Sequence, residues 1–266
     1  AIAPLPPLDA FQTMLLTAGE RDLAAFNTDP AAVAATGMRL LRLLAWAMTG
    51  KESDQPLAQQ VADSWSPARP EAAILINAAL ILCADHGLNI SSFTARCVAS
   101  AGTQPYLAVN AALCALRGHR HGGQTGQVAA FLDEAEADPS AAVANHLKSG
   151  LFVPGHLPGF GHPLYPDGDP RGRCLVERVH ELLPDAPGLS LADEIVQIAE
   201  RELGIAPTID FGLVLLARAL GLPAGAPLLL FALGRTAGWV GQINEEYQRG
   251  RLIRPRAEYV GERPGM

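Results

Sequence analysis

The feature that most limits how this chain can fold is a helical spacing of apolar residues that recurs, between Gly and Pro interruptions, along nearly its whole length. No stretch shows the sustained polar and apolar alternation of a β-strand. With 266 residues, of which 49% are hydrophobic, the chain can bury a large core. We therefore predict an all-α protein with helices over residues 8–26, 30–49, 56–65, 70–84, 91–101, 105–117, 124–137, 138–149, 170–183, 190–203, 210–220 and 226–248.

One of these helices stands out because residues 70–84 are apolar on nearly every face. Such a segment is typical of a helix surrounded by others in a large bundle, so we predict that it is buried throughout.

Composition and charge exclude several classes of protein. The net charge of -7 does not provide the basic surface that nucleic-acid binding requires. The longest apolar run, residues 224–240, is interrupted by Arg235 and is shorter than a membrane span, so we expect no membrane association. The four cysteines form no CxxC pair and are typical of reduced residues in a cytoplasmic protein. The chain does not begin with Met, and we expect an N-terminal piece to precede it.

A loop rich in Pro and Gly occupies residues 154–171, PGHLPGFGHPLYPDGDPR. The backbone must turn repeatedly there, and the loop ends where Asp169 suits a helix N-cap and Pro170 the first helical position. His162 and Arg171 then lie about one loop apart, beside backbone N–H groups at the positive end of a helix dipole. This arrangement predicts a site that attracts carboxylates.

A second change in composition marks a boundary between domains. Residues 117–124 are rich in His, Arg and Gly, unlike the helices on either side. We predict a large helical domain from residues 1–120 and 218–266, and a smaller helical domain from residues 121–217 that carries the loop.

Arg235 is the residue whose position is hardest to explain without a ligand. It interrupts an apolar helix, where a guanidinium is costly unless an anion faces it, and Gly234 and Gly238 leave room for one. An internal salt bridge to Asp or Glu is the alternative. Other polar residues also have alternative interpretations. His119 and His121 can be a metal pair, His86 can be a helix C-cap, and Asp210 can be a plain N-cap.

Four motifs, taken together and in order, resemble the citrate synthase superfamily: Asp85-His86 with Asn89, His121-Gly122-Gly123, Gly159-Phe160-Gly161-His162 with Asp169-Pro170-Arg171, and Asp210 after a helix-ending Gly. The likeness runs from about residue 71 to 260. It implies a citrate synthase-like fold, a homodimer, and no permanently bound cofactor or metal.

The resemblance also implies roles for individual residues. Asp210 corresponds to the general base that takes a proton from the methyl group of a coenzyme A thioester, and His121 donates a hydrogen bond to the thioester oxygen. His162 protonates the ketone oxygen of oxaloacetate, and His86 helps to bind it. Its carboxylates are held by Arg171, Arg235 and, from the partner subunit, Arg254. Gly159, Phe160 and Gly161 belong to the coenzyme A-binding loop.

These residues predict an acyltransferase that converts acetyl-CoA, oxaloacetate and water to citrate and CoA, as in the tricarboxylic acid cycle. Citryl-CoA lyase and 2-methylcitrate synthase are alternatives because the same base and donors serve all three reactions. A degenerate member that senses a dicarboxylate or coenzyme A is the non-enzymatic alternative, and a zinc protein is a third. The chain departs from the family pattern in three places. Its N-terminal region is shorter, Cys83 stands where many members carry a further His, and Pro166 stands where many carry a basic residue.

Overall fold

The computed structural model describes residues 5–149 and 157–261, so Pro154, Gly155 and His156 of the predicted loop lie outside the described residues. Within those ranges there are twelve α-helices, one 3-10 helix and no strand, and two isolated bridges join Phe160 to Pro207 and His162 to Tyr165. The predicted all-α class is confirmed. The helices are α1 (Pro7–Arg21), η1 (Leu23–Phe26), α2 (Pro30–Thr49), α3 (Leu57–Trp65), α4 (Ala72–Ala84), α5 (Ile90–Ser100), α6 (Pro105–Leu116), α7 (Gln124–Ala135), α8 (Pro139–Ser149), α9 (Pro170–Leu182), α10 (Leu189–Leu203), α11 (Ile209–Leu220) and α12 (Ala226–Arg249).

The helix boundaries follow local chemistry. Pro30, Pro105 and Pro170 each begin a helix, where the missing N–H costs nothing. Gly50 ends α2 in the left-handed conformation at φ +67°, which a residue with a side chain adopts only with strain. Asp169 caps α9 as predicted, and its carboxylate accepts the backbone N–H of Arg171.

The first predicted helix is too long. α1 ends at Arg21, and residues 23–26 form η1 instead, because Asp22 leaves the helical conformation (φ -92°, ψ 81°). Its carboxylate accepts hydrogen bonds from the Arg39 guanidinium and from the Tyr106 hydroxyl, both at 2.8 Å. A tertiary contact therefore overrides the helical pattern at this point.

α4 is also less buried than predicted. Leu75, Ile76 and Ala79 are fully buried, but Ile74 and Ile81 on the other face are 57% and 64% exposed. The prediction of burial on every side is wrong, because α4 packs against α3, α9, α11 and α12 and these helices leave Ile74 and Ile81 exposed.

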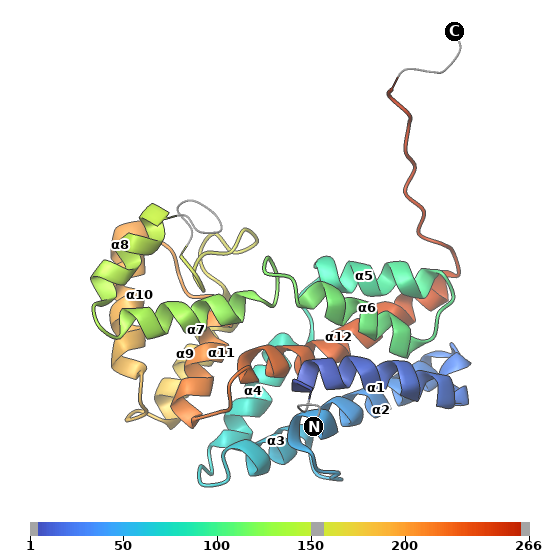
Figure 1. Cartoon of the computed structure of the whole chain (residues 1–266), viewed down its shortest axis with the longest axis horizontal. Coiled ribbons are helices and arrows are strands. Elements are labelled where there is room, and N and C mark those ends of the chain that lie inside the picture. Colours follow the sequence, from blue (N-terminus) through green and yellow to red (C-terminus); the bar gives the residue numbers. More distant parts are fainter. Residues whose placement is uncertain (1–4, 150–156, 262–266) are drawn as a thin grey trace.

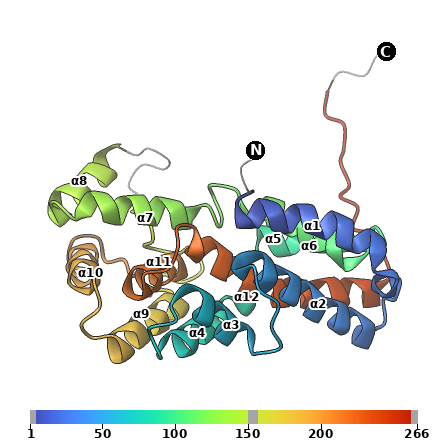
Figure 2. The same cartoon turned by 60° about the horizontal axis from the view of Figure 1, so that its bottom comes forward.

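α12 organises one end of the molecule. It packs against α2, α4, α5 and α6, and Figure 1 shows it running among them. At the other end, α11 packs against α7 and α9, while α10 contacts α8. Figure 2 shows the same two groups, which correspond to the proposed large and small domains. That division into domains stays a prediction.

α2 is the one described helix whose length and composition would allow it to cross a membrane. It carries Val33, Leu40 and Leu44 at 0% exposure, and it packs against α12, α1, α3 and α6. Its apolar character is thus used in the core of this fold.

Candidate active site

A cavity of about 100 Å³ lies where the two groups of helices meet. Six of the seven residues predicted to act in catalysis or substrate binding line it, from the end of α4, the loop before α7, the loop before α9, the starts of α9 and α11, and the middle of α12. The full lining consists of His86, Asn89, His121, Gly122, His162, Arg171, Ile209, Asp210, Phe231 and Arg235. The chain therefore brings side chains up to about 150 positions apart into one small space.

Arg171 is held in place by the residue that caps its own helix. The Arg171 Nε and NH2 groups donate to the two oxygens of Asp169 at 3.0 and 2.8 Å. Asp169 also accepts the backbone N–H of Ile209 at 3.1 Å. Burial raises the pKa of the Asp169 carboxyl, but Arg171 and these hydrogen bonds outweigh burial, so the pKa is lowered. Asp169 thus joins the start of α9 to the start of α11, a role that the sequence did not reveal beyond the N-cap.

Arg235 is fully buried in α12. Its Nε donates to the Cys83 carbonyl at 2.7 Å, and its guanidinium carbon lies 5.0 Å from the centre of the Phe231 ring. Both terminal nitrogens are buried without a hydrogen-bond partner. Burial lowers the pKa of Arg235 to about 10. Within the described residues no carboxylate pairs with it, so the internal salt bridge considered above is not found.

The turn at residues 162–165 fixes the His162 ring. The backbone N–H of Leu164 donates to His162 Nδ1 at 3.2 Å, so a neutral ring carries its hydrogen on Nε2. Burial, and then Arg171, lower the pKa of His162, which favours this neutral form.

His86 occupies the segment after α4. Its Nδ1 lies 3.0 Å from the Tyr165 hydroxyl, and its Nε2 is buried without a partner. Burial, followed by Arg171 and Arg235, lowers the pKa of His86 to about 4. His86 is therefore not simply a helix C-cap, because its ring contacts the loop and lines the cavity.

The His121 ring is neutral. Burial, followed by Arg235, lowers the pKa of His121 to about 4. Its Nε2 lies 2.8 Å from Ser91 Oγ, which accepts a hydrogen bond from Trp239 Nε1 at 3.2 Å. Among the described residues, no group of three or more His, Cys, Asp or Glu side chains is placed to hold a metal ion. Ser91 and Trp239 were not identified as site residues from the sequence.

Asp210 is the second residue of α11 and lines the cavity. Burial raises the pKa of its carboxyl to about 6, although Arg171 opposes the change. A plain N-cap aspartate would accept backbone N–H groups and have a lowered pKa, so the N-cap interpretation does not explain this residue. At neutral pH Asp210 is a largely ionised carboxylate with unusual affinity for a proton.

The remaining predicted residues lie elsewhere. Arg254 is exposed on the extended tail that leaves the body after α12 (Figure 1). The Phe160 side chain is buried against Phe211, with ring centres 4.9 Å apart. The Gly159 carbonyl accepts the Thr208 N–H at 2.8 Å, so residues 159–161 anchor the loop to the start of α11. Their predicted contact with coenzyme A is not tested by these interactions.

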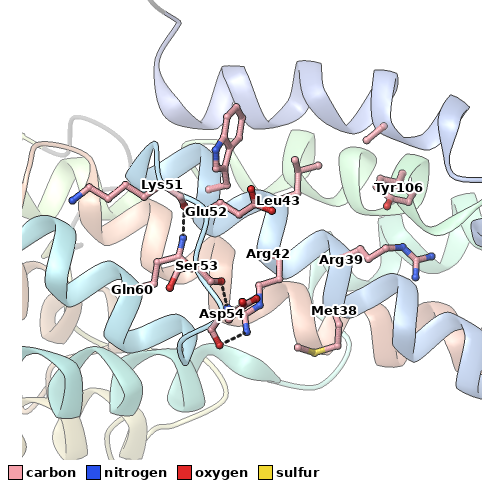
Figure 3. Close-up of a pocket in the computed structure, with 12 residues that line it drawn as sticks. Met38, Arg39, Arg42, Leu43, Lys51, Glu52, Ser53, Asp54, Gln60 and Tyr106 are labelled. Carbon is pink, nitrogen blue, oxygen red and sulfur yellow. Dashed lines mark hydrogen bonds between the residues drawn. The ribbon is translucent and has the colours of Figure 1, made fainter.

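A larger cavity lies far from these residues. Figure 3 shows this space of about 730 Å³ between α1, α2 and the segment joining α2 to α3. Its guanidiniums already have partners: Arg42 donates to the Ser53, Asp54 and Gln55 carbonyls, and Arg39 pairs with Asp22. One buried guanidinium with unpartnered nitrogens, that of Arg235, rather than volume therefore distinguishes the smaller cavity.

Known proteins provide an independent comparison. A family model described as the citrate synthase C-terminal domain matches residues 3–256. The citrate synthase of Haloferax volcanii is 36% identical over 191 residues, which cover 70% of this chain and 49% of that protein. The chain spans about half the length of the curated relatives it matches.

Solved structures extend the likeness to the whole fold. Citrate synthase from Thermotoga maritima MSB8 superposes with a TM-score of 0.78 at 26% identity, covering 99% of this chain and 74% of that one. Citryl-CoA lyase from Hydrogenobacter thermophilus has the same fold at a TM-score of 0.68 and 24% identity, covering 80% of this chain and 87% of that one.

Proposed function

The chain belongs to the citrate synthase family, and we propose that it condenses acetyl-CoA, oxaloacetate and water to citrate and free CoA. One observation carries this proposal. The cavity is lined by Arg235, whose two terminal nitrogens are buried without a partner, and by three imidazoles with lowered pKa values, a second guanidinium and a carboxylate with a raised pKa. An oxo diacid would supply the missing negative charge, and the carboxylate would serve as a base.

The first step is the removal of a proton from the thioester methyl group. Asp210, with a pKa of about 6, is ionised at neutral pH and can hold the proton it accepts. His121 would donate a hydrogen bond to the oxygen that becomes negative, and Ser91 Oγ, which lies 2.8 Å from His121 Nε2 and donates to Asn89 Oδ1 at 2.9 Å, holds its ring in place. Trp239 N–H fills an acceptor position of Ser91 and keeps that hydroxyl oriented. A neutral donor of this kind remains neutral through the step.

The second step joins the two substrates. The enol carbon attacks the ketone carbon of oxaloacetate, and His162 Nε2–H supplies a proton to the oxygen as its charge develops. Arg171, Arg235 and His86 would orient the carboxylates, with Arg254 of a second subunit completing the set. Water then cleaves the thioester bond, which releases citrate and the CoA thiol.

Citryl-CoA lyase is the second candidate. The solved citryl-CoA lyase from Hydrogenobacter thermophilus has the same fold as this chain. The lyase reaction breaks the same carbon–carbon bond in reverse and uses the same base and donors. A 2-methylcitrate synthase would differ only in a larger acyl group.

We also propose that the protein works as a cytoplasmic homodimer and, where it makes citrate, in the tricarboxylic acid cycle. The substrates bind transiently, so coenzyme A acts as a co-substrate and no permanent cofactor is needed. A dicarboxylate sensor would keep the arginines but would not need a carboxylate with a raised pKa.

The experiment is a thiol-release assay with purified protein and oxaloacetate, using acetyl-CoA and propionyl-CoA separately. A third reaction measures cleavage of citryl-CoA to acetyl-CoA and oxaloacetate. Thiol release from acetyl-CoA supports the synthase, preference for propionyl-CoA supports the methylcitrate enzyme, and cleavage without thiol release supports the lyase. If no reaction shows turnover but oxaloacetate still binds, the result supports the dicarboxylate sensor.

A further inference from the structure

Tyr165 connects the loop to the opposite wall of the cavity. It lies three residues after His162, and its backbone N–H donates to the His162 carbonyl at 2.8 Å. Its hydroxyl lies 3.0 Å from His86 Nδ1, across 79 positions in the chain. The Tyr165 and His86 rings are stacked, with centres 5.3 Å apart and planes 28° apart, and Arg171 lies 5.7 Å from the Tyr165 ring centre. The Tyr165 ring therefore contacts two residues of the site.

The direction of the hydrogen bond follows from the groups involved. A phenol is a stronger acid, and so a better donor, than a neutral imidazole N–H. The Tyr165 hydroxyl therefore donates to Nδ1, and the hydrogen of His86 is on Nε2. That nitrogen is buried, lines the cavity through its ring and has no partner in the protein. A diacid requires donors there, because a lone pair would repel a carboxylate oxygen.

We propose that Tyr165 is a positioning residue that holds His86 in the Nε2–H tautomer and aims this hydrogen at the bound diacid. This inference rests on the proposed function and deepens it. The turn at residues 162–165 then sets both imidazoles in the same way: Leu164 N–H occupies His162 Nδ1, and Tyr165 O–H occupies His86 Nδ1. One short turn presents two Nε2–H donors to one ligand.

The test compares Tyr165→Phe, which keeps the stacked ring and removes the hydroxyl, with Tyr247→Phe. Tyr247 is a matched control because its hydroxyl donates to the Thr103 carbonyl, away from the cavity. Nitrogen-15 NMR of the ligand-free protein at pH 7 reports which nitrogen of His86 carries hydrogen, and a His86→Asn spectrum assigns the signal. We expect a single Nε2–H tautomer in the wild type and in Tyr247→Phe, and a mixture of tautomers in Tyr165→Phe.

Binding provides the second readout. Calorimetry should show oxaloacetate binding about tenfold more weakly to Tyr165→Phe, as expected for one oriented hydrogen bond, and unchanged binding to Tyr247→Phe. Hydrogen on Nδ1 in the wild type, or the same His86 tautomer in Tyr165→Phe, would overturn the proposal. Because the NMR measurement uses the free protein, it decides the role of Tyr165 even where no condensation is detected, an outcome that would count against the proposed function alone.

Discussion

The buried charge of Arg235 lowers the stability of the free protein but favours the binding of an anion. Its guanidinium is fully buried, and only Nε has a hydrogen-bond partner, the Cys83 carbonyl. An unpaired buried charge is among the costliest features that a protein interior can contain. Because Arg235 also lines the cavity, an anion bound there would offset this cost. The free protein is therefore predisposed to bind a dianion.

This argument predicts the behaviour of Arg235→Met, which fills a similar volume without charge. We expect its melting temperature without ligand to be no lower than that of the wild type, since an uncompensated charge is removed. Millimolar oxaloacetate should raise the melting temperature of the wild type but not of the variant. The exposed Arg201→Met provides a control that keeps the oxaloacetate effect. If ligand-free Arg235→Met melts well below Arg201→Met, the claim that the buried Arg235 charge destabilises the free protein is wrong.

Asp210 predicts the pH dependence of the reaction. Its pKa is raised to about 6, so the base is lost to protonation as the pH falls through 6, and kcat/KM should fall about tenfold per pH unit below that value. His86 and His121, with pKa values of about 4, remain neutral through this window. Initial rates between pH 4.5 and 8 provide the measurement, and a profile that is flat down to pH 5 would contradict the role of Asp210.

At the scale of helices and loops, the sequence was informative where chemistry is local. Helix limits marked by Gly50, Pro105 or Asp169 were predictable, because a cap or a proline acts on its immediate neighbours. The motifs also predicted which side chains line the cavity. The sequence did not predict the bonds that orient them, such as Asp169 to Ile209 across 40 positions, since only the packing of α9 on α11 brings these groups together. The exposed face of α4 was missed for the same reason.

Two glycines in α12 provide a matched test of how α4 is seated. A Cβ on Gly238 would lie 2.1 Å from the Ala84 carbonyl oxygen, whereas a Cβ on Gly241 would meet nothing within 4 Å. Gly238→Ala should therefore push back the end of α4, lower the free energy of unfolding by about 1–3 kcal/mol and weaken oxaloacetate binding through His86. Gly241→Ala should raise the free energy of unfolding by about 0.5–1 kcal/mol and leave binding unchanged.

Urea titrations of the two variants, combined with oxaloacetate binding, provide the measurement. Equal effects of the two substitutions would show that close approach of α12 to the Ala84 carbonyl is not needed at the site.

At the scale of the whole molecule, the extended tail is the feature that points beyond one chain. Residues 251–261 leave the body after α12 and project from it (Figures 1 and 2). Ile253 N–H donates to Ser100 Oγ at 3.0 Å, and beyond that contact Arg254 is exposed and apart from the cavity of its own chain. An extended arm of this kind suits the proposed exchange between two subunits.

Mixing inactive subunits tests that exchange. Asp210→Asn removes the base, and Arg254→Ala removes the arm residue, so each homodimer should be nearly inactive. If Arg254 acts on the partner, a heterodimer contains one complete site, and an equal mixture after refolding together should recover about a quarter of wild-type activity. Refolding each variant alone is the control. No recovery in heterodimers isolated by two different tags would contradict an Arg254 contribution across the interface.

The most direct test of the whole account is the rate of CoA thiol release from acetyl-CoA and oxaloacetate, compared between Asp210→Asn and the exposed Asp185→Asn. We predict that Asp210→Asn lowers kcat by about 10²–10⁴-fold, the contribution of a general base, while it still binds oxaloacetate and Asp185→Asn keeps the wild-type rate. Equal rates for the two variants would contradict the claim that this cavity carries out the condensation.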